Sequence, residues 1–248
     1  MMNIAQYLDS TYLKTPAQSG ISNEETLQLD KDLAQEAIDN AIFAVMIRPD
    51  YVADIKKYIQ ERNSNVAVGT VIGFHEGTYT IDEKLAEASK AIEDGADELD
   101  FVINYNAYLK GDLELVKEEF VKCTQLGLKH NKVVKWIIEI AALTDGQIAD
   151  LTKNIASWAE ENFSETDFPH IFVKSSTGFY QTEGGKPNGA TFEGIRIMLD
   201  HAGKLPVKAA GGVRTPEDAE KMISMGVKRI GTSSALALIK NGSSSEGY

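Results

Sequence analysis

Residues 207–218 read VKAAGGVRTPED, and this stretch contains a complete strand–loop–helix unit. Its first four residues are short and mostly apolar, as in a strand that is buried on both faces of a parallel sheet. Two glycines follow, and then Thr215 and Pro216 supply a helix N-cap and a proline at the first helical position. The segment therefore predicts a β-strand that leads through a tight loop into an α-helix.

The same alternation of short apolar runs and longer amphipathic stretches extends along the chain. The other apolar runs are 42–47, 66–74, 99–103, 133–140, 171–173 and 229–231, and residues 6–9 form a weaker candidate. The amphipathic stretches have apolar residues three and four positions apart, and they are 23–40, 80–94, 112–130, 145–161, 191–201 and 216–225. We count seven strand–helix units, and the weaker strand makes eight.

Eight such units in 248 residues are what a TIM (β/α)8 barrel requires. We therefore predict a single α/β domain of this fold over residues 1–240. An open, doubly wound sheet is the alternative, because periodicity does not show closure, but the Gly-x-Gly-x-x-Gly fingerprint is absent after the early strands. Residues 241–248, NGSSSEGY, have the composition of a flexible tail.

The composition excludes two classes of partner. With 25 Lys and Arg against 37 Asp and Glu, the formal charge is −12, whereas binding to nucleic acid or to an anionic membrane needs a basic surface. The N-terminus lacks the features of a signal peptide, and no apolar run approaches the roughly 18 residues of a membrane span. A single cysteine, Cys123, cannot form an internal disulfide, so we expect a reducing, cytoplasmic location.

Three lysines interrupt apolar strands, whereas most of the others fall on polar helix faces. They are Lys135, Lys174 and Lys208. A lysine in such a strand must form an ion pair, extend its ammonium group to water or lose its proton. A structural ion pair is the alternative to a chemical role for each of them.

Lys174 and Lys208 belong to consecutive units, so in a barrel they lie on neighbouring strands about 4.8 Å apart. Two ammonium groups this close repel each other, which drives one toward the neutral amine that attacks a carbonyl carbon. Asp100, in another strand, points into the same interior if the alternation holds, where it balances the charge or transfers protons. The pattern predicts a lysine that forms a Schiff base.

Two loops near the end of the chain are candidates for binding an anion. Gly211 and Gly212 precede Arg214 and the helix that begins after Thr215, and residues 231–234, GTSS, follow the next strand. Small residues allow backbone N–H groups to approach a ligand, and phosphate is commonly bound after the last two strands of this fold. Each Gly-rich turn alone is weak evidence, but together they predict a phosphate site.

Metal binding has little support in the sequence. The histidines are scattered at positions 75, 130, 170 and 201, without a metal-binding spacing. This pattern favours catalysis through a lysine imine over catalysis through a zinc ion.

These residues resemble a known family along nearly the whole chain. The segments 97–100 (DELD), 173–178 (VKSSTG) and 207–215 (VKAAGGVRT) are similar to the signature segments of the deoxyribose-phosphate aldolases. The resemblance implies a class I aldolase without cofactor or metal, which reversibly cleaves 2-deoxy-D-ribose 5-phosphate into acetaldehyde and D-glyceraldehyde 3-phosphate. It also implies a phosphosugar as the small-molecule partner and a homodimer as the assembly.

Carried over position by position, the resemblance assigns roles to individual residues. Lys174 is the nucleophile, Lys208 lowers its pKa, and Asp100 moves protons with Lys208. The residues implied to contact or support substrate are Asp9, Thr11, Lys135, Thr177 and the C-terminal Tyr248, for which a disordered terminus is the alternative. The phosphate-binding residues are Gly178, Gly211, Gly212, Arg214, Ser233 and Ser234.

The chain departs from the family pattern at several positions. Phe179 stands where many members have a lysine, which puts one phosphate contact in doubt unless Lys186 in the long following loop replaces it. Ala209 stands where proline is often found. Met46 replaces a reactive cysteine of some relatives, so we expect less inactivation by crotonaldehyde than in a Met46→Cys variant. Two other functions stay open: another phosphosugar aldolase or transaldolase-like barrel, and a catalytically silent barrel that binds sugar phosphates.

Overall fold

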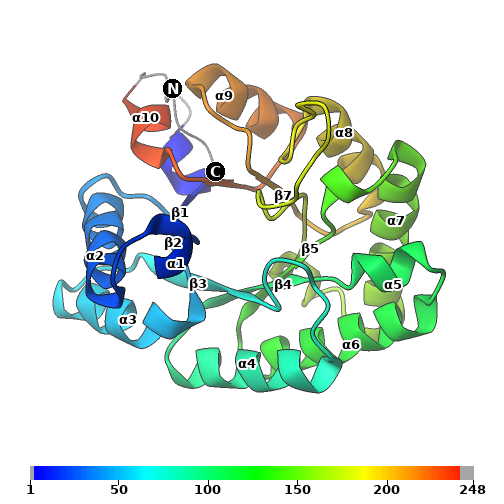
Figure 1. The fold of residues 1–248 in the computed structure, drawn as a ribbon. Helices are drawn as coiled ribbons and strands as arrows, with labels where there is room; N and C mark the ends of the chain where they lie inside the picture. The colour runs from blue at the N-terminus through cyan, green and yellow to red at the C-terminus, as the bar shows by residue number, and fades with distance from the viewer. Residues whose placement is uncertain (1–2, 241–248) are drawn as a thin grey trace.

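The computed structural model describes residues 3–240, and in it eight parallel strands close into a barrel in the order of the sequence. Figure 1 shows the strands at the centre and the helices around them. The strands are β1 (Leu8–Thr11), β2 (Ala44–Ile47), β3 (Ala67–Ile72), β4 (Glu98–Val102), β5 (Val133–Ile137), β6 (Ile171–Lys174), β7 (Val207–Ala210) and β8 (Arg229–Thr232). Closure comes from the pairing of β8 with β1, in which Leu8 lies opposite Ile230. The predicted TIM barrel is confirmed, and the open sheet is excluded.

Helices connect the strands and cover the outside of the barrel. The α-helices are α1 (Pro16–Ser19), α2 (Asn23–Asp39), α3 (Val52–Glu61), α4 (Ile81–Glu93), α5 (Tyr105–Leu109), α6 (Leu113–Lys129), α7 (Asp145–Asn162), α8 (Phe192–His201), α9 (Pro216–Met225) and α10 (Ala235–Ile239). Short 3-10 turns are η1 (Ile4–Tyr7), η2 (Pro49–Tyr51), η3 (Ile140–Ala142) and η4 (Phe168–His170). Ser22, Thr80 and Thr144 form capping boxes, which explains where α2, α4 and α7 begin.

The structure corrects the predicted elements at several places. Helices α1, α3 and α5 are absent from the sequence prediction, and α3 begins directly after the 3-10 turn Pro49–Tyr51. The run 133–140 is not one strand, since β5 ends at Ile137 and the backbone at Glu139 turns into the left-handed region. The weak strand at 6–9 is real but shifted, because residues 4–7 form a 3-10 turn.

The main apolar core lies between the strands and the surrounding helices. Trp136 on β5 is fully buried there, stacks on Phe101 and packs against Phe120 of α6. Its indole N–H donates to the Thr124 hydroxyl at 2.9 Å, so the polar atom of this large side chain is satisfied. This apolar layer lies outside the barrel strands, and other residues fill the interior of the barrel.

A second apolar cluster occupies part of the barrel interior, on the side of β1–β3. Leu13, Met46 and Val71 form it, and the partly buried Phe74 and Phe179 pack on it. Gly69 lies opposite Met46 in the β2–β3 register, and a Cβ at position 69 would lie 2.5 Å from the Met46 Cε atom. The glycine therefore makes room for the methionine side chain.

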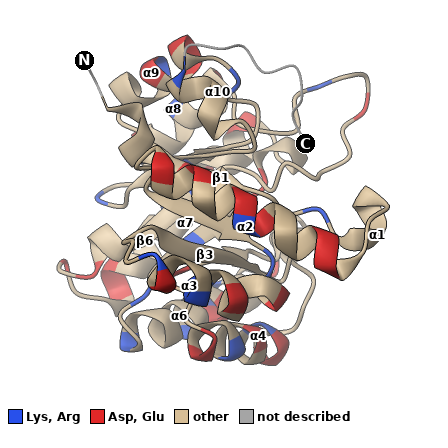
Figure 2. Cartoon of the chain, turned by 90° about the vertical axis from the view of Figure 1, so that its left-hand side faces the viewer, with Lys and Arg blue, Asp and Glu red and all other residues tan. Residues whose placement is uncertain are grey.

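The positions of Lys, Arg, Asp and Glu, which are coloured on the ribbon in Figure 2, lie mainly on the outer helices. They account for the acidic balance of the whole chain, whereas the charges inside the barrel are a separate group. No helix within the described residues is long and apolar enough to span a membrane.

Candidate active site

The three strand lysines all point into the barrel, because their strands are in register with one another. Lys174 on β6 lies opposite Lys208 on β7, and Lys135 on β5 lies opposite Asp100 on β4. In parallel strands, residues paired in this way project to the same face. The register thus brings side chains together that are up to 108 positions apart in the sequence.

Asp100 binds all three lysines through its two carboxylate oxygens. Its Oδ1 atom accepts from Lys135 at 2.7 Å, and its Oδ2 atom accepts from both Lys174 and Lys208 at 2.8 Å. Because the latter two ammonium nitrogens bind one oxygen, they lie closer together than like charges normally do. The expected pairing of Lys174 with Lys208 around Asp100 is present in the structure.

The charged cluster continues toward the amino ends of the strands. The Oδ2 atom of Asp9 lies 2.5 Å from the Lys208 ammonium, and its Oδ1 atom accepts from the Nε atom of Arg229 at 2.8 Å. Glu98 bridges Arg229 and Lys135, with a distance of 2.7 Å to the lysine. Arg229 in turn stacks on the Phe43 ring, 3.7 Å from its centroid.

Within the described residues, this cluster contains more cations than carboxylates. The four cations are Lys135, Lys174, Lys208 and Arg229, and the three acids are Asp9, Glu98 and Asp100. Burial opposes ionisation of Asp100, but the three ammonium groups outweigh burial and hold its pKa well below its usual value. Asp100 therefore stays ionised, and one lysine lacks a carboxylate of its own.

Within this cluster, the pKa of Lys174 is lowered. Burial lowers its pKa to about 8, Asp100 opposes the change, and Lys208 and Lys135 add to it. In contrast, burial is overcome at Lys135, whose pKa Asp100 and Glu98 raise. The Lys174 side chain is 4% exposed, against 0% for Lys135 and Lys208, so the ammonium group whose pKa burial lowers is also the one nearest to solvent. A neutral amine at this position can attack a carbonyl carbon.

Other residues expected to contact substrate lie at different depths. Asp9 and Lys135 are completely buried in the charged cluster, where they support the other two lysines. The Thr11 hydroxyl donates to the Asp9 carbonyl at 2.8 Å. Thr177 follows Lys174 by three positions, is buried, and binds Glu139. Tyr248 and the rest of segment 241–248 lie outside the described residues.

The predicted phosphate residues gather in the loops that follow β6, β7 and β8. Gly178, Gly211 and Gly212 all have φ between 72° and 80°, a conformation that glycine adopts without strain. A Cβ at Gly189 would lie 2.6 Å from the carbonyl carbon of Gly211, so the loop after β6 packs directly on the loop after β7. Arg214 and Ser233 are exposed, and Ser234 is half-buried at the start of α10.

Several backbone donors in these loops have no acceptor among residues 3–240. Within residues 3–240, the N–H groups of Gly212, Val213 and Ser233 form no hydrogen bond to another protein group. Thr215 caps helix α9 by accepting from Asp218, so the helix N-terminus follows directly. Unpaired N–H groups beside a helix N-terminus and an arginine suit a bound anion.

The comparisons with known proteins agree with this geometry. The model of the DeoC/LacD family aldolases matches residues 7–245. The chain belongs to this aldolase family. The deoxyribose-phosphate aldolase of Caldicellulosiruptor saccharolyticus is 38% identical over 238 residues, which cover 95% of this chain and 96% of that protein. The deoxyribose-phosphate aldolase of Thermococcus gammatolerans is 37% identical over 99% of both chains.

A solved structure of the same family supports the barrel. The deoxyribose phosphate aldolase of Aeropyrum pernix, which is described as a tetramer, superimposes with a TM-score of 0.75 and 29% identity over 96% of this chain and 89% of that chain. The recognition of the aldolase family from the three signature segments is therefore confirmed.

The positions that depart from the aldolase pattern differ in burial: Phe179 is partly exposed and Lys186 is exposed, whereas Met46 and Ala209 are buried. Phe179 packs edge-on against Phe74, with centroids 5.0 Å apart, and stacks on His75 at 5.6 Å. Lys186 is exposed in the loop, and no ion pair joins it to another described residue. Met46 and Ala209 are both fully buried.

Three charged residues near the lysines were not singled out from the sequence. Glu98 lies two positions before Asp100, which in a strand places both carboxylates on the same face, so alternation could have identified it. Arg229 opens β8, where the short strand gave no pattern to interpret. Glu139 follows β5 and became recognisable only once the backbone turn at that position was known.

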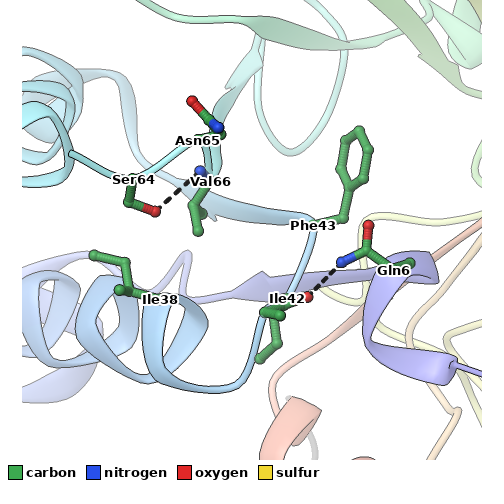
Figure 3. A pocket seen from close by; sticks show the side chains of 8 residues that line it. Gln6, Ile38, Ile42, Phe43, Ser64, Asn65 and Val66 are labelled. Atoms are coloured by element: carbon green, nitrogen blue, oxygen red, sulfur yellow. Dashed lines mark hydrogen bonds between the residues drawn. The ribbon is translucent and has the colours of Figure 1, made fainter. Parts of the chain in front are cut away.

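A cavity of about 420 Å³ lies at the opposite end of the barrel from Lys174. Figure 3 shows its lining, in which Phe43 and Val66 directly precede β2 and β3 and Gln6 donates to the Ala41 carbonyl at 2.6 Å. This cavity is therefore separate from the lysine cluster. In residues 3–240, no group of three or more His, Cys, Asp or Glu side chains is arranged to hold a metal ion.

Proposed function

We propose that this chain reversibly cleaves 2-deoxy-D-ribose 5-phosphate to acetaldehyde and D-glyceraldehyde 3-phosphate through an imine on Lys174. The observation that carries the proposal is the pair of ammonium groups, Lys174 and Lys208, on one oxygen of Asp100. The two relatives match this chain over nearly their full length, and both are named deoxyribose-phosphate aldolase. Their names support 2-deoxy-D-ribose 5-phosphate as the substrate.

In the proposed reaction, the neutral amine of Lys174 attacks the C1 aldehyde of the open-chain sugar. The carbinolamine loses water to give a protonated imine. Removal of the proton from the C3 hydroxyl then breaks the C2–C3 bond, and its electron pair moves to the imine nitrogen as an enamine. D-glyceraldehyde 3-phosphate leaves, C2 takes up a proton, and water releases acetaldehyde and restores the amine.

Asp100 and Lys208 are proposed to exchange protons with the intermediates, because they lie beside the Lys174 nitrogen and bind each other. The unpaired N–H groups of the loops after β7 and β8, with Arg214, are proposed to hold the phosphate. Tyr248 is proposed to assist proton transfer at C2, as the family resemblance implies.

A substrate panel tests the proposal. Wild type and Lys174→Leu are assayed with 2-deoxyribose 5-phosphate and with fructose phosphates, by detecting the aldehydes released. We expect cleavage of 2-deoxyribose 5-phosphate by wild type alone. Preferential cleavage of a fructose phosphate would favour another phosphosugar aldolase. Binding of 2-deoxyribose 5-phosphate without turnover would contradict an enzymatic function.

The proposal also includes the cellular compartment and the oligomeric state of the protein. A cytoplasmic location is supported by the single cysteine, Cys123, which is buried as a free thiol. A homodimer is the assembly that the family resemblance implies, although the A. pernix relative is described as a tetramer. Light scattering coupled to size-exclusion chromatography distinguishes the two states by mass.

A further inference from the structure

Glu139 lies at the carboxyl end of the barrel, beside the proposed nucleophile. It follows β5 with φ 55° and ψ 68°, a left-handed conformation that is uncommon for residues other than glycine. The next residue, Ile140, donates its N–H to the Ser175 carbonyl at 2.9 Å, which ties this turn to the segment after Lys174. The Glu139 side chain is thereby turned inward and is only 1% exposed.

One carboxylate oxygen of Glu139 accepts two hydrogen bonds from Thr177. Its Oε2 atom accepts from the Thr177 N–H at 3.1 Å and from the Thr177 hydroxyl. The hydroxyl oxygen of Thr177 in turn accepts from the Phe179 N–H at 3.0 Å. The other oxygen of Glu139, Oε1, is buried and has no hydrogen-bond partner among the described residues.

These contacts determine what Thr177 can still bind. A threonine hydroxyl has one proton and two lone pairs. The proton is directed to Glu139, and one lone pair is used by Phe179, so only a lone pair is left for a ligand. Phosphate oxygens are acceptors, so Thr177 in this state is unsuited to them. It is suited to a substrate hydroxyl, which donates.

We propose that Glu139 is a positioning residue that fixes Thr177 as a hydrogen-bond acceptor, and that this pair selects acceptor aldehydes with a hydroxyl group on the carbon next to the carbonyl. The inference rests on the proposed aldolase function, because in the direction of synthesis the acceptor is D-glyceraldehyde 3-phosphate, which has such a hydroxyl.

The alternative is that Glu139 merely stabilises the turn after β5. The two roles differ in what they do to substrate selection. A structural role lowers the rate with every acceptor by the same factor, whereas a positioning role affects only acceptors that carry the hydroxyl. A site built to bind a hydroxyl also rejects an analogue that lacks it, because buried polar groups are then left unpaired.

The experiment measures kcat and KM for addition of acetaldehyde to D-glyceraldehyde 3-phosphate and to 3-oxopropyl phosphate, which lacks the 2-hydroxyl. We expect wild type to prefer the hydroxylated acceptor by at least about 10-fold in kcat/KM. In Glu139→Met the preference should fall to within about 3-fold, through loss on the hydroxylated acceptor, with kcat for 3-oxopropyl phosphate kept within about two-fold. If Glu139→Met does not fold, Glu139→Ala serves the same comparison.

Three further variants separate the two roles. Thr177→Val should abolish the preference, and adding it to Glu139→Met should cause no further loss, because the two residues act as one unit. Glu139→Gln should retain most of the preference, since its amide oxygen still accepts from Thr177. Asp30→Asn, a change at another buried acid on α2, is the matched control and should leave the preference unchanged.

An equal loss on both acceptors in the Glu139 variants would overturn this proposal and leave the aldolase function intact. Wild type is first assayed for cleavage of 2-deoxyribose 5-phosphate. Absence of that cleavage would overturn the proposed function, and this inference with it.

Discussion

Two buried lysines of this barrel have opposite electrostatic surroundings. Lys84 on α4 is completely buried, donates to the carbonyls of Gly77 at 2.8 Å and Val102 at 2.6 Å, and forms an ion pair with Glu119. Lys174 is almost as deeply buried, but its carboxylate, Asp100, also binds two other lysines. Lys84 has a counter-charge of its own, whereas Lys174 shares one.

The difference shows that burial alone does not make a lysine reactive. Lys84 and Glu119 join the loops after β3 and β4, since Glu119 also accepts from the Asn104 N–H at 2.8 Å. Such a pair is a structural support. At Lys174, burial and shared charge act together, and they lower its pKa to about 8. The proposed reactivity of Lys174 follows from the missing carboxylate.

Replacing Lys174 tests the comparison with the largest expected effect. Lys174→Met should reduce cleavage of 2-deoxyribose 5-phosphate by at least about 10³-fold, because no amine is left to form the imine. Stability at pH 7 should stay within about 1 kcal/mol of wild type or increase, because the change removes the excess cation. Urea unfolding and an activity assay on the same sample check both expectations. A large loss of stability would contradict the proposed charge imbalance.

The pH dependence of that stability has a defined sign. The pKa of Lys174 is lower in the folded protein than the usual value near 10.4, so the unfolded chain binds more protons between pH 8 and pH 10. Wild type should therefore gain stability relative to Lys174→Met as the pH rises through this window. A difference that is constant with pH would contradict the lowered pKa.

Replacing Lys84 should lower stability and leave activity nearly unchanged, which is the reverse of the result expected for Lys174. Lys84→Met leaves Glu119 buried without its partner, which costs about 3–5 kcal/mol of unfolding free energy. Glu119→Leu added to Lys84→Met should recover part of this loss, as urea unfolding would show. Activity of the folded fraction below the transition should stay within a few-fold of wild type. Loss of imine formation in a folded Lys84→Met protein would contradict a purely structural role.

A third buried charge, Asp30 on α2, extends the comparison to a group without any hydrogen-bond partner in the described residues. Burial raises its pKa to about 7. The folded protein therefore binds more protons than the unfolded chain between about pH 4 and pH 7, and stability falls as the pH rises through that window.

Asp30→Asn removes this titration. It should stabilise the protein by about 2–3 kcal/mol at pH 8 and by much less at pH 5. Asp32→Asn, which replaces an exposed carboxylate on the same helix, is the control for the loss of one acidic charge. Thermal unfolding at both pH values measures the difference. An equal effect of Asp30→Asn at pH 5 and pH 8 would contradict the raised pKa.

The smallest expected effect comes from adding a lysine that is not deeply buried. Phe179 is partly exposed where many aldolases have a lysine, and Phe179→Lys places a cation among the loops of the predicted phosphate site. We expect KM for 2-deoxyribose 5-phosphate to fall by about 3–10-fold with little change in kcat, and KM for unphosphorylated 2-deoxyribose to stay constant. Equal changes for both substrates would argue against a phosphate contact.

The sequence predicted the residues that follow simple periodicity, and missed those that depend on the backbone path. Lys135, Lys174, Lys208 and Asp100 interrupt apolar strands, so both the barrel and its interior charges were recognisable. The pairing of three lysines with one carboxylate needs the strand register, which no local pattern contains.

Glu139 shows why part of the site escaped prediction. The run 133–140 is apolar enough to indicate a continuous strand, but the chain leaves β5 after Ile137, and the turn directs the Glu139 carboxylate at Thr177. A left-handed backbone at a glutamate has no sequence signature. The imbalance of charge could likewise not be predicted from the sequence, because it depends on Arg229. The two carboxylate partners of Arg229 lie 131 and 220 positions away.

The most direct test of the central claim is to trap the imine chemically. The protein is incubated with acetaldehyde and borohydride at pH 7.5, digested and mapped by mass spectrometry. The account predicts an N-ethyl group on Lys174, with Lys84, Lys135 and Lys208 unmodified, because Lys174 alone among these four combines shared charge with access to solvent. No adduct on Lys174, or a principal adduct on one of the other three, would contradict it.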